Sequence, residues 1–140
     1  MLICQFANLI NLNLLILFKM ENKNVIMEKS FAFALQIIEY TEEMESQKKY
    51  VLSRQLLRSG TSIGANIREA QSCESRADFI HKLSIALKEA NETEYWLMLL
   101  HDTDYLDGKS FQSIIIDCRE LIKLLVSIIK TAKKGKGIDN

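Results

Sequence analysis

The chain has 140 residues, of which 48% are hydrophobic and 26% are charged, a composition typical of a single soluble globular domain. Eighteen basic and eighteen acidic residues give a formal net charge of zero, so the chain lacks the strongly basic composition of many nucleic-acid-binding proteins. It contains no proline and only five glycines, which favours long helices over many short strands.

The cysteines give no sign of a disulfide framework or a zinc site. Cys4, Cys73 and Cys118 are odd in number and form no CxxC motif. We therefore expect reduced thiols in a cytoplasmic protein.

The first nineteen residues, MLICQFANLINLNLLILFK, are uncharged up to the final lysine. The apolar run 9–18 is interrupted by Asn11 and Asn13 and is shorter than the roughly 20 residues that span a bilayer. The positive segment and the cleavage site of a secretory signal are also absent. We expect no membrane role for this segment, with a membrane anchor as the alternative.

Residues 1–24 therefore form either an N-terminal extension or a segment that precedes the true start. The polar sequence MENKNVIMEKS begins at Met20 and is typical of an ordinary N-terminus. We expect translation to begin at Met20 or Met27, with Met1 as the alternative.

The first amphipathic segment covers residues 27–44. Apolar residues at steps of three and four form one helical stripe, which we expect to face the core. The stripe consists of Met27, Phe31, Ala34, Leu35 and Ile38, and it is widened by Phe33, Ile37, Tyr40 and Met44.

The second helix is predicted over residues 49–73. Its apolar residues keep one helical phase straight through RSGTSIGANIREAQ (residues 58–71), although this stretch holds two glycines. Those apolar residues are Leu52, Leu56, Ile63, Ile67 and Ala70. Each glycine costs roughly 1 kcal/mol relative to alanine inside a helix, so we expect something to pack against them.

The third helix is predicted from Ser75, which can act as its N-cap, to about Tyr105. Its apolar steps of four and three are typical of bundle packing, and they comprise Phe79, Leu83, Ala86, Ala90, Thr93, Leu97 and Leu100.

The fourth helix opens near Asp107 and Gly108 and carries two apolar stripes, which predict neighbours on two sides. One stripe is Phe111, Ile115, Cys118, Ile122, Leu125, Ile129 and Ala132, and the other is Ile114, Leu121 and Ile128. Short connections then predict an all-α, antiparallel up-down-up-down four-helix bundle over residues 25–134, followed by a frayed tail at residues 135–140.

Three interpretations of the two glycines compete. A phosphate-binding loop needs a following lysine and a preceding strand, and both are missing. A turn between helices would break the apolar phase. The third interpretation is a small-residue helix face, formed by Gly60 and Gly64, that lets another backbone approach. The partner is either a helix of the same chain or another subunit, in which case Ser59, Ser62 and Asn66 would supply hydrogen bonds.

Two motifs, LLRSGTSIGANIREA (Leu56–Ala70) and DFIHKLSIALKEANETEYWL (Asp78–Leu97), resemble the bacterial four helix bundle protein family. Its members are also called 23S ribosomal RNA intervening-sequence proteins, and the family is similar to the accessory variability determinant proteins of diversity-generating retroelements. The similar positions are Arg58, Ser59, Gly60, Ser62, Gly64, Asn66, Glu69, Lys88, Glu89, Asn91, Glu92, Glu94 and Trp96.

The resemblance implies an antiparallel bundle that assembles into a ring-like homopentamer. Through the retroelement relatives it also implies RNA or DNA binding by a basic surface, with a reverse transcriptase or another protein as partner. The segment before Met20 departs from the family pattern.

No residue set in the chain specifies a reaction. Two histidines are too few for the paired Glu-x-x-His motifs of a di-iron bundle, so we expect no metal, no cofactor and no catalysis. Glu89, Glu92 and Glu94 could form a catalytic cluster, but ion pairing with Arg58 or Arg68 across the bundle is the preferred interpretation. Trp96 needs a partner for its indole N–H.

Basic residues fall on two helical arcs that could hold phosphates. Arg54, Arg58 and Arg68 lie within roughly 80° on the second helix, and Lys123, Lys130 and Lys134 lie within about 40° on the fourth. The sequence thus predicts a non-enzymatic oligomer with backbone binding to RNA or DNA, and the alternative is a protein-interaction scaffold without nucleic-acid binding.

Overall fold

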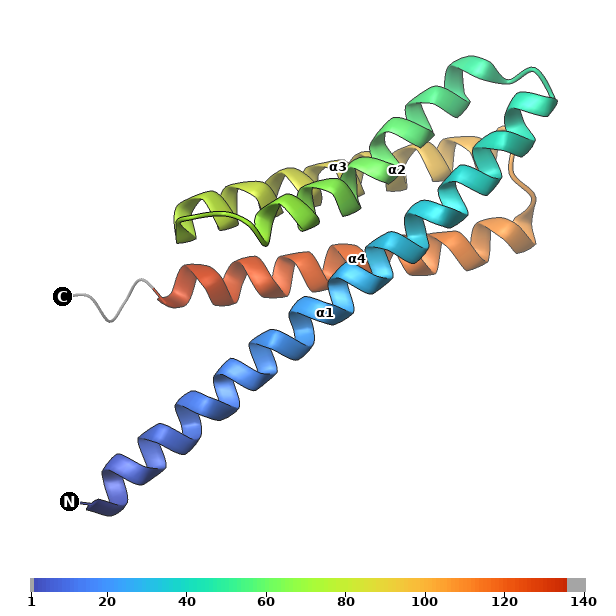
Figure 1. Ribbon diagram of the computed structural model, residues 1–140. Coiled ribbons are helices and arrows are strands. Elements are labelled where there is room, and N and C mark those ends of the chain that lie inside the picture. The colour runs from blue at the N-terminus through green and yellow to red at the C-terminus, as the bar shows by residue number, and fades with distance from the viewer. Residues whose placement is uncertain (1, 136–140) are drawn as a thin grey trace.

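A computed structural model describes residues 2–135, and before Val25 it describes side chains only at Ile10, Asn13, Leu14, Ile16 and Leu17. The helices in this range are α1 (Leu2–Ser46), α2 (Tyr50–Ala70), α3 (Arg76–Asp102) and α4 (Gly108–Lys134). Each helix packs against two others in the cyclic order α1, α2, α3, α4, and short loops make consecutive helices antiparallel (Figure 1). The predicted four-helix bundle is confirmed. The tail predicted to fray lies outside the described residues apart from Gly135.

Side-chain caps fix the beginnings of α3 and α4. The Ser75 hydroxyl accepts a hydrogen bond of 3.1 Å from the backbone N–H of Asp78, so its predicted role as N-cap is confirmed. The Asp107 carboxylate accepts a bond of 2.9 Å from the backbone N–H of Ser110. These bonds satisfy N–H groups that have no partner inside their own helix.

The cores of α2, α3 and α4 follow the predicted apolar phases. Among their buried residues are Leu56, Ile63, Ile67, Ala70, Leu83, Ala86, Ala90, Leu97, Leu100, Ile114, Ile115, Cys118, Leu121, Leu125 and Ile129. The polar Thr93 is buried with them and donates its hydroxyl hydrogen to the Glu89 carbonyl at 2.8 Å. The unbroken phase across the glycines of α2 therefore reflects one continuous helix.

In α1 only the widened part of the predicted stripe faces the core, where Phe33, Ile37 and Met44 are buried as expected. The core side of the helix consists of Ile26, Ser30, Phe33, Ile37, Thr41 and Met44. Phe31, Leu35 and Ile38, which the periodicity assigned to the core, are exposed. The helix carries two apolar faces, and the steps of three and four residues cannot tell which one meets the rest of the chain.

α1 also begins far earlier than the predicted Met27. Residues 2–46 contain neither proline nor glycine, so no residue in that range breaks the helix. Toward its N-terminus α1 diverges from the other three helices (Figure 1). Within residues 2–135 no helix has a stretch that is long and apolar enough to cross a bilayer.

The two glycines of α2 lie against α1. A Cβ atom placed on Gly60 would be 2.8 Å from Cγ1 of Ile37, closer than real carbon atoms approach, and one placed on Gly64 would be 3.4 Å from the Ser30 carbonyl oxygen. The bare side of α2 therefore allows a close approach by α1, and it brings the fully buried Ile37 onto Gly60.

Alanine substitutions at these two glycines should have opposite effects. Both should gain roughly 1 kcal/mol of helix propensity. At Gly60 the new methyl group overlaps the branched, buried side chain of Ile37, and such overpacking costs about 1–3 kcal/mol. We expect Gly60→Ala to lower the free energy of unfolding, measured by urea denaturation, and Gly64→Ala to leave it unchanged or raise it. Equal effects at the two positions would contradict this packing.

Candidate interaction surface

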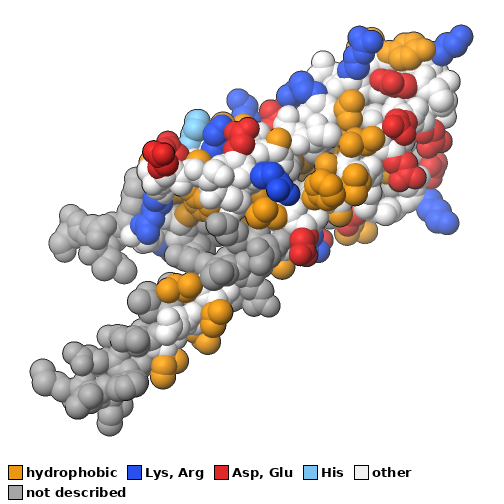
Figure 2. All heavy atoms as spheres, in the orientation of Figure 1, with side chains coloured by type: hydrophobic (Ala, Val, Ile, Leu, Met, Phe, Trp, Pro, Cys, Tyr) orange, Lys and Arg blue, Asp and Glu red, His pale blue; other side chains and the backbone are white. Residues whose placement is uncertain are grey.

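The most exposed large apolar cluster on the bundle segment of α1 is formed by Phe31, Leu35 and Ile38, which we call the outer face of α1. Their side chains are 60%, 53% and 39% exposed, and their spacing of four and three residues aligns them along the helix. Hydrophobic side chains gather along this side of the molecule (Figure 2). Contiguous exposed apolar residues of this kind mark interaction sites more often than scattered ones do.

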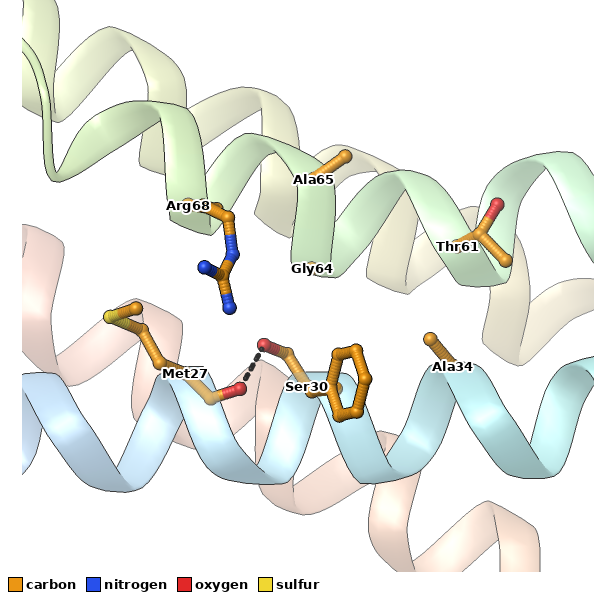
Figure 3. A pocket seen from close by; sticks show the side chains of 8 residues that line it. Met27, Ser30, Ala34, Thr61, Gly64, Ala65 and Arg68 are labelled. Atoms are coloured by element: carbon orange, nitrogen blue, oxygen red, sulfur yellow. Dashed lines mark hydrogen bonds between the residues drawn. The ribbon is translucent and has the colours of Figure 1, made fainter.

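A groove between α1 and α2 continues the outer face. It encloses about 210 Å³ and is lined by Met27, Ser30, Phe31, Ala34, Thr61, Gly64, Ala65 and Arg68. Most of these side chains are small, and Gly64 has none. The Arg68 guanidinium extends from α2 toward α1 at one end of the groove (Figure 3). The groove therefore offers an apolar floor with a cation at its edge.

The predicted arginine arc on α2 is divided by the structure. Arg54 and Arg68 are exposed, and Arg68 lines the groove. Arg58 instead reaches α3, where its guanidinium forms ion pairs with Glu89, at 3.2 Å, and with Glu92. The preferred pairing of Arg58 with glutamates across the bundle is thus observed, so two carboxylates already neutralise the cation predicted to hold a phosphate.

Glu92 joins this ion pair to the aromatic side chain beside it. Its carboxylate accepts a 3.1 Å bond from the indole N–H of Trp96, which satisfies that donor. Hydrogen bonding from Arg58, followed by that from Trp96, lowers the pKa of Glu92, while the bond to Glu92 raises the pKa of Arg58. The network fixes α2 against α3, and the third glutamate, Glu94, pairs with Arg119 of α4 at 3.0 Å.

The polar residues around the glycines are bonded within their own helix. Ser59 donates to the Leu56 carbonyl at 3.4 Å, Ser62 to the Arg58 carbonyl at 2.6 Å, and the Asn66 amide to the Ser62 carbonyl at 2.8 Å. Because Ser59 is buried, its hydroxyl cannot contact another molecule, whereas Ser62 and Asn66 are half-buried. The structure therefore gives these three residues a role in α2 itself.

The lysines of α4 remain together on one exposed face. Lys123, Lys130 and Lys134 are exposed and extend over about 16 Å of helix. Among the described residues none of the three forms an ion pair. Acidic side chains gather instead at the end of the bundle where α1 meets α2, beyond the opposite end of α4 (Figure 2).

The described residues form no candidate metal centre. Within them no three His, Cys, Asp or Glu side chains converge to hold a metal ion. Cys118 is buried, its thiol donates to the Ala90 carbonyl at 3.5 Å, and burial raises its pKa to about 12. Such a thiol is not activated as a nucleophile.

The sequence reasoning did not identify the outer face of α1 as a surface. The signal was present, because residues 27–44 carry two apolar stripes. The same pattern on the fourth helix correctly predicted neighbours on two sides. On α1 no described helix packs against the second stripe, so a stripe assigned to the core is a surface.

Comparisons with known proteins agree with this architecture. Residues 22–127 match the model of the family described as 23S rRNA-intervening sequence protein. A crystal structure of a protein of unknown function from the S23 ribosomal protein family of Bacteroides thetaiotaomicron VPI-5482 is 57% identical in sequence, with a TM-score of 0.75. The match covers 78% of this chain and 98% of that one. No curated protein matches the chain.

The link between Arg58 and Glu92 makes part of the stability pH-dependent. The pKa of Glu92 is lower in the folded state than its ordinary value of 4.5. The ion pair therefore contributes fully to the free energy of unfolding above pH 4.5, and this contribution is lost as the pH falls through the lowered pKa of the folded state. The pair is largely exposed, so the contribution should be within about 1 kcal/mol.

We expect the wild type to be more stable than Glu92→Gln at neutral pH and the difference to shrink as the pH falls from about 7 to about 3. Urea denaturation across this range measures the two free energies of unfolding. A difference that stays constant over the whole range would contradict the role given to Glu92.

Proposed function

The chain belongs to the 23S rRNA-intervening sequence protein family, and from that premise we propose that it is a non-catalytic subunit that assembles with further copies of itself through the outer face of α1. The observation that carries this proposal is the exposure of Phe31, Leu35 and Ile38 beside the groove. Fully burying a side chain of this size contributes roughly 1.5–3 kcal/mol, which makes the face a source of binding free energy.

The groove supports assembly rather than binding of a small molecule. It is open, and its floor consists of alanine, glycine and the stems of larger residues. Closely packed interfaces need such shallow recesses between helices, because side chains of one partner fit between those of the other. The exposed Arg68 lines the groove at the margin of the face, where charged residues are usual. Five copies in a ring is the number that the family resemblance implies.

Phosphate binding is a second proposed function, and it is favoured by the lysine row of α4. Lys123, Lys130 and Lys134 present like charges along one face, while the acidic end of the bundle lies away from them. Binding of this kind depends on charge and not on base sequence. Repetition of the row in an assembly would strengthen the field that attracts RNA or DNA.

Assembly can be tested with one substitution in the full chain. We expect Leu35→Asp to weaken self-association at least tenfold, because a carboxylate would be buried in an apolar contact. Light scattering after size-exclusion chromatography measures the mass over a range of concentrations. Ile116→Asp is the matched control, because Ile116 is similarly exposed on α4. A monomeric wild type, or equal masses for Leu35→Asp and wild type, would refute the proposal.

The lysine row can be tested by charge reversal. The double variant Lys130→Glu/Lys134→Glu should bind single-stranded RNA and duplex DNA more weakly, and the negative slope of log K against log salt should become shallower by roughly two. Fluorescence anisotropy measures both quantities. Lys109→Glu, on the same helix but near its other end, should have little effect. If neither nucleic acid is retained at low salt, the protein-interaction scaffold without nucleic-acid binding is supported instead.

A further inference from the structure

Residues 2–21, which we call the N-terminal arm, lie before the region matched by the family and extend α1 beyond the bundle (Figure 1). Ile10, Leu14 and Leu17 on this arm are 61%, 65% and 63% exposed. Like the residues of the outer face, they are spaced by four and three residues. They therefore form a second apolar stretch of the same length on the same helix.

Within one chain, the apolar stretch of the arm and the outer face of α1 cannot pack against each other. Both belong to one continuous helix, and Leu14 and Leu35 are separated by twenty-one residues, or about 32 Å along its axis. A helix without a break cannot fold back on itself. The arm also diverges from α2, α3 and α4, so these helices do not shield it (Figure 1). Both stretches therefore need a partner from outside the chain.

The chemistry of the arm fits a protein partner better than a lipid surface. Helices that lie on membranes usually carry lysine or arginine on their polar side. Here the residues between Leu2 and Phe18 are uncharged, and their polar members are Gln5, Asn8, Asn11 and Asn13. An uncharged helix can dock on an apolar face without removing a charge from water.

We propose that the N-terminal arm of one copy lies on the outer face of α1 of a second copy. Each chain supplies one arm and one face with matching spacing, so every copy in a closed assembly can give one contact and receive one. The outer face gains a defined occupant, and the exposed residues of the arm are covered at the same time. This proposal rests on the proposed self-assembly and on translation from Met1, the alternative start, and it specifies the partner segment.

Disulfide trapping tests the contact, because two positions about 32 Å apart on one helix cannot be joined within a chain. Two full-length proteins are prepared in a Cys4→Ser/Cys73→Ser background, one with Leu14→Cys and the other, enlarged by a tag, with Leu35→Cys. After mixing and mild oxidation, a non-reducing gel should show a band of one copy of each. The control carries Ile16→Cys in place of Leu14→Cys. The side chain of Ile16 points away from the apolar stretch of the arm, because it is turned by about 100° from Leu17 and by more from Leu14.

A mixed band at least fivefold stronger with Leu14→Cys than with Ile16→Cys would support the contact. Equal bands, or no mixed band in a mixture that is still assembled by light scattering, would overturn it. Self-assembly is judged separately with three proteins. If Leu35→Asp dissociates the assembly while Leu14→Asp and a chain that starts at Met20 assemble like wild type, the arm has no role in assembly. In that case the proposed contact is wrong and the proposed function stands.

A membrane role is a distinguishable outcome. Full-length protein that sediments with phosphatidylcholine vesicles, and loses this binding on Leu14→Asp, would overturn the proposal in favour of a lipid surface. Retention of the protein in the supernatant, together with the mixed disulfide, would support it.

Discussion

The contact between Ile37 of α1 and Gly60 of α2 determines how the rest of the molecule is arranged. Because Gly60 has no side chain, the two helices come close enough for Ile37 to be completely buried. That contact fixes the rotation of α1 about its axis. Phe33 and Ile37 then face the core, and Phe31 and Leu35 on the same helix must face outward. A packing requirement inside the bundle thus creates the apolar surface on its exterior.

The sequence predicted much of the fold because the apolar stripes of α2, α3 and α4 agree with the way these helices pack. Ser75 caps α3 as expected, and the apolar phase of α2 continues through Gly60 and Gly64. On α1 the helix was predicted but Phe31, Leu35 and Ile38 were wrongly assigned to the core, because two apolar faces compete there and periodicity cannot choose between them. Of the predicted phosphate-binding residues, the lysines of α4 remain grouped, whereas Arg58 is engaged by glutamates that are distant in sequence. Such a pairing depends on how neighbouring helices are rotated relative to each other, and the sequence pattern of a single helix does not give that rotation.

Ion pairs at the margins of the bundle hold neighbouring helices in register. Lys29 pairs with Glu120 between α1 and α4 at 3.0 Å, and Lys82 pairs with Glu69 between α3 and α2 at 2.6 Å. These exposed pairs contribute little stability individually. Among the described residues, Lys123, Lys130 and Lys134 of α4 take no part in such pairs, and the outer face of α1 carries no charge, so these two surfaces have a distinct character. The proposed assembly surface and the proposed phosphate-binding row therefore share no residues.

The account depends most on the outer face of α1 being covered by another copy. Hydroxyl-radical footprinting with mass spectrometry measures solvent access at single side chains in the assembled protein. Phe31 and Leu35 should be oxidised nearly as slowly as the buried Phe33, and their protection should disappear when dilution dissociates the assembly. Oxidation of Phe31 and Leu35 at the rate of the freely exposed Val51, at concentrations where the protein is assembled, would contradict the account.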